Sequence, residues 1–116
     1  MKKITIIVIL GFLLLSPIAS AEPNNKICND VLLTSLSPAI SNAISGYYGY
    51  PRLYGMYDAK ILRIERVHEG EYTFNVTVQV KTFVGAHNHP FGLETMTIAV
   101  SPGSMLVSKF HHEDAN

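Results

Sequence analysis

The sequence predicts an α+β domain in which one kinked helix packs on a four-stranded antiparallel meander sheet. Apolar residues between positions 31 and 47 recur every three or four residues, which is the periodicity of an amphipathic helix. Later segments alternate apolar and polar residues, as strands with one buried face do. Short turn sequences separate these segments and favour antiparallel neighbours. A helix and a one-sided sheet can cover each other, and cystatin-like folds offer an analogy for this arrangement.

The predicted helix begins near Asn29 or Asp30, either of which can cap it, and ends near Ser45, before Gly46. Pro38 lies inside it. Proline removes one backbone donor and clashes with the preceding turn, at a cost of about 3 kcal/mol, so we expect a kink or break there. The side chains expected on the buried face are Val31, Leu32, Leu36, Ala39, Ile40, Ala43, Ile44 and Tyr47.

Four strands are expected after the helix, in the order of a meander. Their ranges are 58–67, 71–83, 93–100 and 105–110. Turn sequences at Glu69-Gly70 and Pro102-Gly103 separate the first pair and the last pair. The side chains expected to face inward in the two middle strands are Tyr72, Phe74, Val76, Val78, Val80, Met96, Ile98 and Val100.

The beginning of the chain predicts export. Residues 1–21 have a basic start, an apolar run and a small-residue cleavage site at Ala21, which are the three zones of a secretory signal peptide. The apolar run is shorter than the roughly 20 residues that span a bilayer, so an uncleaved anchor is the less favoured interpretation. We therefore expect a secreted or envelope-exterior protein with no stable membrane span after cleavage. Its expected parts are a polar leader at 22–27, a single domain at 28–110 and a polar tail at 111–116.

Composition excludes several classes of function. Nine basic and nine acidic residues balance each other, which gives no attraction to nucleic acid or to an anionic membrane. The single cysteine cannot form an internal disulfide. The glycines are scattered and do not form a phosphate-binding or dinucleotide-binding loop, so we expect no cofactor.

Three segments carry a resemblance to a known family. They are LSPAI on the predicted helix, YYGYPRLYGMYDAKIL after it, and FNVTVQVKTFVGAHNHPFGLETMTIAVSPG through the strands. Together they resemble a family of small secreted proteins of spore-forming Gram-positive bacteria, known as domain of unknown function 3888. The resemblance runs from Cys28 to about Lys109. It implies secretion and the α+β fold, and it assigns no catalytic residue.

The loop GAHNHP departs from that family at one position. The family's loop is similar to GAHNPP, so His89 stands where a proline is expected, while His87, Asn88 and Pro90 fit the pattern. This departure weakens a metal site at His87 and His89 as a family property. Such a site would need further ligands, with Glu94, His111 and His112 as candidates. A solvated hairpin connection is the favoured interpretation of the loop.

Catalysis has one candidate set. Cys28 lies near the predicted helix start, where a helix dipole stabilises a thiolate, and His87 with Asn88 lies between strands. A small hydrolase or a metal-binding protein using this loop is therefore the alternative function. No nucleophile signature surrounds Cys28.

The favoured function is non-enzymatic binding of a protein, a peptide or a cell-envelope component. The expected binding residues are Tyr50, Tyr54 and Tyr57 of the tyrosine-rich connector, together with the loop from His87 to His89. The competing interpretation is structural: the tyrosines cover one end of a small core and keep their hydroxyls in water. A third hypothesis is pH sensing by the histidines, since imidazole titrates near neutral pH.

Overall fold

The computed structural model describes residues 23–116, so the predicted signal peptide lies outside the described residues. Residues 31–116 form one compact unit, and a second unit ends at Asp30. No helix in the described residues combines the length and the hydropathy that crossing a bilayer requires.

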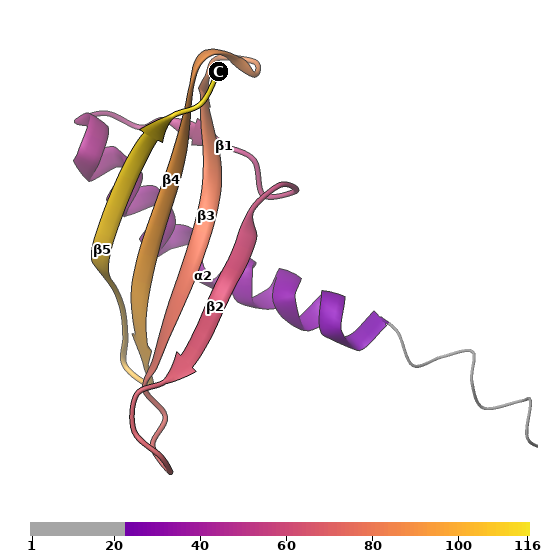
Figure 1. Cartoon of the computed structure of the whole chain (residues 1–116), viewed down its shortest axis with the longest axis vertical. Helices are drawn as coiled ribbons and strands as arrows, with labels where there is room; N and C mark the ends of the chain where they lie inside the picture. Colours follow the sequence, from indigo (N-terminus) through magenta and orange to yellow (C-terminus); the bar gives the residue numbers. More distant parts are fainter. Residues whose placement is uncertain (1–22) are drawn as a thin grey trace, which may run out of the picture. The chain divides into compact units, whose positions relative to one another are not determined.

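Within residues 23–116, one helix is followed by a five-stranded antiparallel sheet. The elements are α2 (Pro23–Tyr48), β1 (Leu53–Tyr54), β2 (Lys60–Arg66), β3 (Phe74–Val84), β4 (Asn88–Ser101) and β5 (Ser104–Asp114). β3 pairs with β4 along one edge, and β1 and β2 share its other edge. The C-terminal half of α2 lies across one face of the sheet (Figure 1). The α+β class and the antiparallel order of the four predicted strands are confirmed, and the two-residue β1 is an addition.

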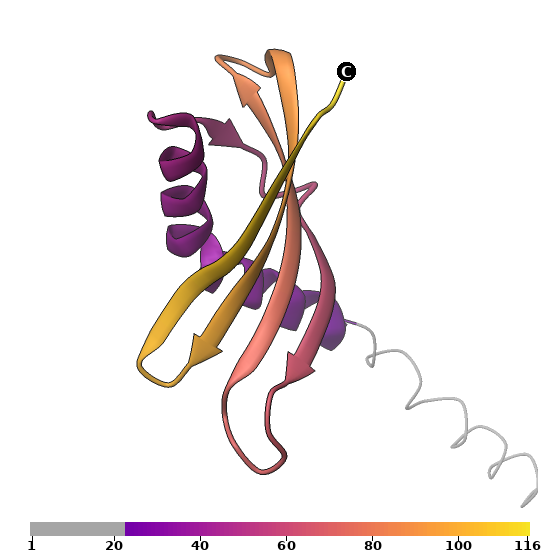
Figure 2. The same cartoon turned by 60° about the vertical axis from the view of Figure 1, so that its left-hand side comes forward.

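The helix starts earlier than the sequence predicted, and it continues through its proline. α2 begins at Pro23, so neither Asn29 nor Asp30 is its cap, and the predicted leader at 22–27 is helical from Pro23. Proline suits a first helical position because its missing N–H would have no partner there. The chain stays helical at Pro38. The axis of α2 changes direction part-way along the helix (Figure 2).

The core lies between the helix and the middle of the sheet. Its buried apolar side chains are Leu33, Leu36, Ile40, Ile44, Val76, Val78, Val80, Met96 and Ile98. Leu33 was not predicted, whereas Val31 and Tyr47 are 58% and 52% exposed. Leu36, Ile40 and Ile44 of the predicted face are buried, and Leu32, Ala39 and Ala43 pack against the core, so most of this face is confirmed. Its edge shifts from Val31 and Tyr47 towards Leu33. Tyr72 precedes β3 and is 71% exposed, which corrects its predicted inward position.

The last strand is longer than predicted. β5 runs to Asp114, so His111 to Asp114 belong to the sheet, and the prediction of a polar tail at 111–116 is wrong for these residues. They pair with the beginning of β4, where Glu94 lies opposite His112. Backbone pairing with β4 therefore extends β5 through residues whose polar side chains give no strand pattern in the sequence.

The histidine loop is a tight turn. β3 ends at Val84 and β4 begins at Asn88, so only residues 85–87 connect the strands. Gly85 and His87 both have positive φ angles, of 56° and 63°. The left-handed conformation lets the chain reverse within this short connection. Most of the predicted loop is therefore strand.

Candidate functional site

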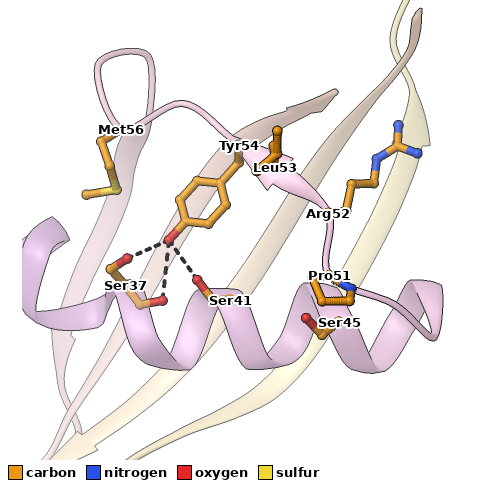
Figure 3. A pocket seen from close by; sticks show the side chains of 8 residues that line it. All are labelled: Ser37, Ser41, Ser45, Pro51, Arg52, Leu53, Tyr54 and Met56. Carbon is orange, nitrogen blue, oxygen red and sulfur yellow. Dashed lines mark hydrogen bonds between the residues drawn. The ribbon is translucent and has the colours of Figure 1, made fainter. Parts of the chain in front are cut away.

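A groove opens between α2 and the segment that follows the helix. Its volume is about 380 Å³. It is lined by Ser37, Ser41, Ser45, Pro51, Arg52, Leu53, Tyr54 and Met56 (Figure 3). We refer to these eight residues as the α2–β1 groove.

One wall of the groove is a row of serines. Ser37, Ser41 and Ser45 are four residues apart, and this spacing places them on one face of α2. The Tyr54 hydroxyl lies 2.7 Å from Oγ of Ser37 and 3.3 Å from Oγ of Ser41. It also lies within 3.3 Å of the Ser37 carbonyl oxygen. These hydrogen bonds join β1 to α2 across the groove.

The other wall contains Arg52, whose side chain turns away from the serines (Figure 3). Its guanidinium carbon lies 4.4 Å from the centre of the Tyr48 ring. Its Nη2 donates a hydrogen bond of 2.5 Å to the carbonyl oxygen of Pro90. Its Nε is buried and makes no hydrogen bond. Arg52 thus connects the groove wall to the end of α2 and to the beginning of β4.

Next to Arg52 lies a polar cluster centred on the buried side chain of Glu94. The Glu94 side chain is fully buried, and its Oε2 accepts hydrogen bonds of 2.6 Å from the hydroxyls of Tyr48 and Thr82. Its Oε1 accepts a hydrogen bond from Nδ1 of His112. On the other side of the ring, Nε2 of His112 lies 3.0 Å from Oδ1 of Asp114. We call Tyr48, Thr82, Glu94, His112 and Asp114 the Glu94 cluster.

Strand pairing and a glycine make room for the cluster. Glu94 lies opposite His112, and Thr82 lies opposite Gly92, so the side chains meet on one face of the sheet. A Cβ atom at Gly92 would lie 2.5 Å from both Glu94 Oε2 and Thr82 Oγ1, and 2.7 Å from the Tyr48 hydroxyl. The space that Gly92 leaves empty is therefore what allows the three groups to converge.

The cluster raises two pKa values. The hydrogen bond to Glu94 is the main cause that raises the pKa of His112 above 6.5, with Asp114 adding to it and burial opposing it. Burial raises the pKa of Tyr48 above 10.0, and the hydrogen bond to Glu94 adds to that effect. Both shifts favour the protonated forms of His112 and Tyr48, which donate hydrogen bonds to the buried carboxylate of Glu94.

The predicted binding tyrosines occupy different surroundings. Tyr54 lines the α2–β1 groove and is partly buried, whereas Tyr50 and Tyr57 are 52% and 78% exposed. The Tyr50 ring lies 5.9 Å from that of Tyr48, next to the Glu94 cluster. The structural interpretation therefore fits Tyr54 as a cross-link between β1 and α2, while the other two offer surface rings.

The two loop histidines contact different aromatic rings. His87 stacks on Phe83 at 4.2 Å, with Tyr57 6.2 Å away, and His89 lies 4.2 Å from Phe91. Asn88, the third predicted loop residue, is the first residue of β4 and pairs with Val84.

The predicted additional metal ligands form other pairs. Glu94 binds His112, and His111 contacts Glu113 at 3.2 Å. Within residues 23–116, no group of three His, Cys, Asp or Glu side chains is arranged to hold a metal ion.

Cys28 is an exposed thiol on α2, in the unit that ends at Asp30. α2 begins at Pro23, more than one turn before Cys28, and the dipole effect falls off within the first turn. His87 belongs to the other unit, and a hydrolase built on these two residues stays a prediction.

Sequence reasoning missed most of this site, although two signals were present. Glu94 shares the alternation of Met96 and Ile98, which places it on the buried face of β4. The four-residue spacing of the serines marked a polar stripe on the helix beside its apolar one. From the sequence, Glu94 and His112 are predicted only as candidate metal ligands.

A comparison with protein families matches residues 28–114 to DUF3888, described as a protein of unknown function. The chain belongs to the DUF3888 family. The matched range covers α2 from Cys28 and every strand of the sheet, ending at the last residue of β5. The DUF3888 domain therefore includes both the α2–β1 groove and the Glu94 cluster. Searches of curated proteins and of solved structures found no match to the chain.

Proposed function

We propose that this DUF3888 protein is an exported, non-enzymatic binding module that holds a short extended peptide in the α2–β1 groove. The observation that carries the proposal is the groove itself, with a row of serine hydroxyls facing the edge strand β1. A volume of about 380 Å³ is in the range of small ligand sites.

The chemistry of the two walls suits a peptide backbone. The hydroxyls of Ser37 and Ser41 already bond Tyr54, but each serine oxygen has room to accept a further hydrogen bond, so the row can pair with N–H groups of a peptide. In the described sheet β1 pairs with β3 alone, and its second edge is open to an added strand. Leu53 and Met56, which are 55% and 38% exposed, supply apolar contacts for side chains of the peptide.

Hydroxyl-lined surfaces also bind sugars, so an envelope glycan is the second occupant to test. Glycan sites commonly present an exposed aromatic face, and Tyr54 instead uses its hydroxyl to bond α2. This difference favours a peptide. The cystatin-like comparison stays an analogy and adds nothing to the choice of ligand.

The test is a selection of random heptapeptides on the immobilised protein, followed by affinity measurements. We expect enriched peptides to lose binding at least tenfold to Ser41→Tyr, which fills the groove from the exposed face of α2. The matched control is Ser35→Tyr, on the same helix but outside the groove, and it should bind as the original protein does. Peptides that bind both variants equally would contradict the proposal. If the selection enriches no peptide, and peptidoglycan fragments bind the original protein but not Ser41→Tyr, the groove is a glycan site.

Export has its own test. Residues 1–21, placed before a reporter enzyme in a Gram-positive host, should direct the reporter to the medium or the envelope exterior. Mass spectrometry of the exported protein should give Glu22 as its first residue. A reporter retained in the cytoplasm would contradict this part of the proposal.

A further inference from the structure

The Glu94 cluster is built around one carboxylate that water cannot reach. Glu94 is fully buried, and its side-chain partners Tyr48, Thr82 and His112 come from α2, β3 and β5. A buried carboxylate is costly unless donors and an opposite charge compensate it. Tyr48 and Thr82 are neutral donors. His112 can also supply the positive charge, depending on its proton.

The groups that face His112 are carboxylates and uncharged aromatic rings. Glu94 faces it from β4, Asp114 from its own strand, and the rings of Tyr47 and Tyr48 from α2, at 5.1 and 5.8 Å. The cation Arg52 lies on the Tyr48 ring. When His112 is protonated, it sits between two carboxylates. When it is neutral, Nδ1 can still donate a hydrogen bond, but the charge that compensates Glu94 is lost.

The cluster is mechanically connected to the α2–β1 groove. Tyr48 is the last residue of α2, and the groove residues Pro51 to Tyr54 follow it closely in the chain. Arg52, which lines the groove, packs on the same Tyr48 ring that donates to Glu94. A weaker hold on Tyr48 therefore loosens the segment that forms one wall of the groove.

From this geometry we infer that the Glu94 cluster is a proton-controlled clasp that regulates the α2–β1 groove. With His112 protonated, Tyr48 and Arg52 are held in place and the groove is formed. With His112 neutral, segment 49–54 opens more often and the groove binds its ligand more weakly. The inference rests on the proposed function for its consequence in binding, but the clasp itself does not depend on it.

The direction of the effect follows from linkage. Because the fold raises the pKa of His112, the stabilisation is complete below the unfolded value of 6.5 and is lost as pH rises through the folded value. The clasp therefore holds at mildly acidic pH and opens towards alkaline pH. Each unit by which the folded pKa exceeds the pKa in the open state changes the opening equilibrium about tenfold.

Amide hydrogen exchange of segment 49–54 tests the clasp without any ligand. Between about pH 6 and about pH 9, the protection of this segment, corrected for intrinsic exchange, should fall several-fold relative to Val78 in the centre of β3. His112→Gln should give low protection at both pH values. The control His111→Gln, on the same strand but exposed and paired with Glu113, should behave as the original protein. Unchanged relative protection in the original protein would overturn the clasp, whether or not the variants fold.

The affinity of a selected heptapeptide, measured over the same pH range, separates the two proposals. Weaker binding at high pH in the original protein and in His111→Gln, but no pH dependence in His112→Gln, supports regulation of the groove. If the exchange of segment 49–54 depends on pH but peptide affinity does not, and Ser41→Tyr still weakens binding, the regulation is overturned and the peptide site is supported. If the exchange of segment 49–54 depends on pH but Ser41→Tyr leaves peptide affinity unchanged, the clasp is supported and the proposed function is overturned.

Discussion

Tyr48 donates a 2.6 Å hydrogen bond to Oε2 of Glu94, which lies 46 positions further along the chain. This bond fixes the last residue of α2 to the buried face of β4. The same Tyr48 hydroxyl lies 3.2 Å from Nδ1 of His112 and 3.4 Å from Oγ1 of Thr82. One end of the helix is therefore held by polar groups, while the rest of its buried face is held by apolar side chains.

Removing the carboxylate at the centre of this cluster should be severely destabilising. Glu94→Ala leaves the buried hydroxyl of Thr82 and the partly buried side chains of Tyr48 and His112 without the carboxylate that they bond. We expect the free energy of unfolding to fall by about 3–5 kcal/mol in urea denaturation. The control Glu113→Ala removes an exposed ion pair and should cost about 0–1 kcal/mol. Equal losses in the two variants would mean that the cluster contributes nothing special to stability.

Adding one methyl group beside the cluster should also be costly. Gly92→Ala places a Cβ atom 2.5 Å from Glu94 Oε2 and Thr82 Oγ1, so side chains or backbone must move. Overpacking of this kind costs about 1–3 kcal/mol, measurable as a lowered denaturation midpoint. Gly103→Ala is the matched control, because no atom lies within 4 Å of its added Cβ. A midpoint unchanged by Gly92→Ala would show that the cluster adapts freely.

The helix should depend on its apolar stripe. Ile40 is fully buried between α2 and the sheet, and Ile40→Ala is expected to lower the free energy of unfolding by about 2–5 kcal/mol through lost transfer energy and a residual cavity. Val31→Ala, on the same helix but 58% exposed, should change it by less than about 0.5 kcal/mol. The opposite ranking would indicate that α2 packs on the sheet through its Val31 side.

The hydroxyl that joins β1 to the helix should contribute modestly. Tyr54→Phe removes the hydrogen bonds to Ser37 and Ser41 while keeping the ring, with an expected loss of about 0.5–1.5 kcal/mol in the free energy of unfolding. Tyr57→Phe removes a hydroxyl from a side chain that is 78% exposed and should leave stability unchanged. If both variants are equally stable, the bond between β1 and α2 carries no net energy.

Tyr48 should ionise at a higher pH than a free tyrosine side chain. Because burial raises its pKa above 10.0 in the fold, its stabilisation is complete below pH 10 and is lost as pH rises through the folded value. A spectrophotometric titration of tyrosinate should show a late-titrating ring that disappears in Tyr48→Phe. In the control Tyr57→Phe, the late-titrating ring should remain. A late ring that survives in Tyr48→Phe would assign the shifted group to another tyrosine.

Much of the fold could be predicted because local pattern and global structure agree in it. The alternation of Val76, Val78 and Val80 places the three side chains on one face of β3, and burial of that face selects the register of the strand. The helix face was predicted less well, because several residues on two sides of α2 are apolar. Only contact with the sheet selects Leu33 over Val31.

The candidate site was less predictable because its members are polar and far apart in the sequence. His112 lies in a stretch of polar residues that favours a tail, and its position in a strand is fixed by pairing with Glu94. The α2–β1 groove depends on β1, whose two residues give no periodic signal.

By itself, the sequence determined the α+β class, the order of helix and strands, the apolar face of the middle strands and the resemblance to DUF3888. These properties are local, since each follows from periodicity, turn residues or motifs within a short segment. The tertiary structure alone decided that α2 presents Leu33, that β5 extends to Asp114, and that Glu94 is buried with Tyr48, Thr82 and His112. These depend on strand register and on helix rotation, which are set by the packing of side chains that the chain separates by tens of residues.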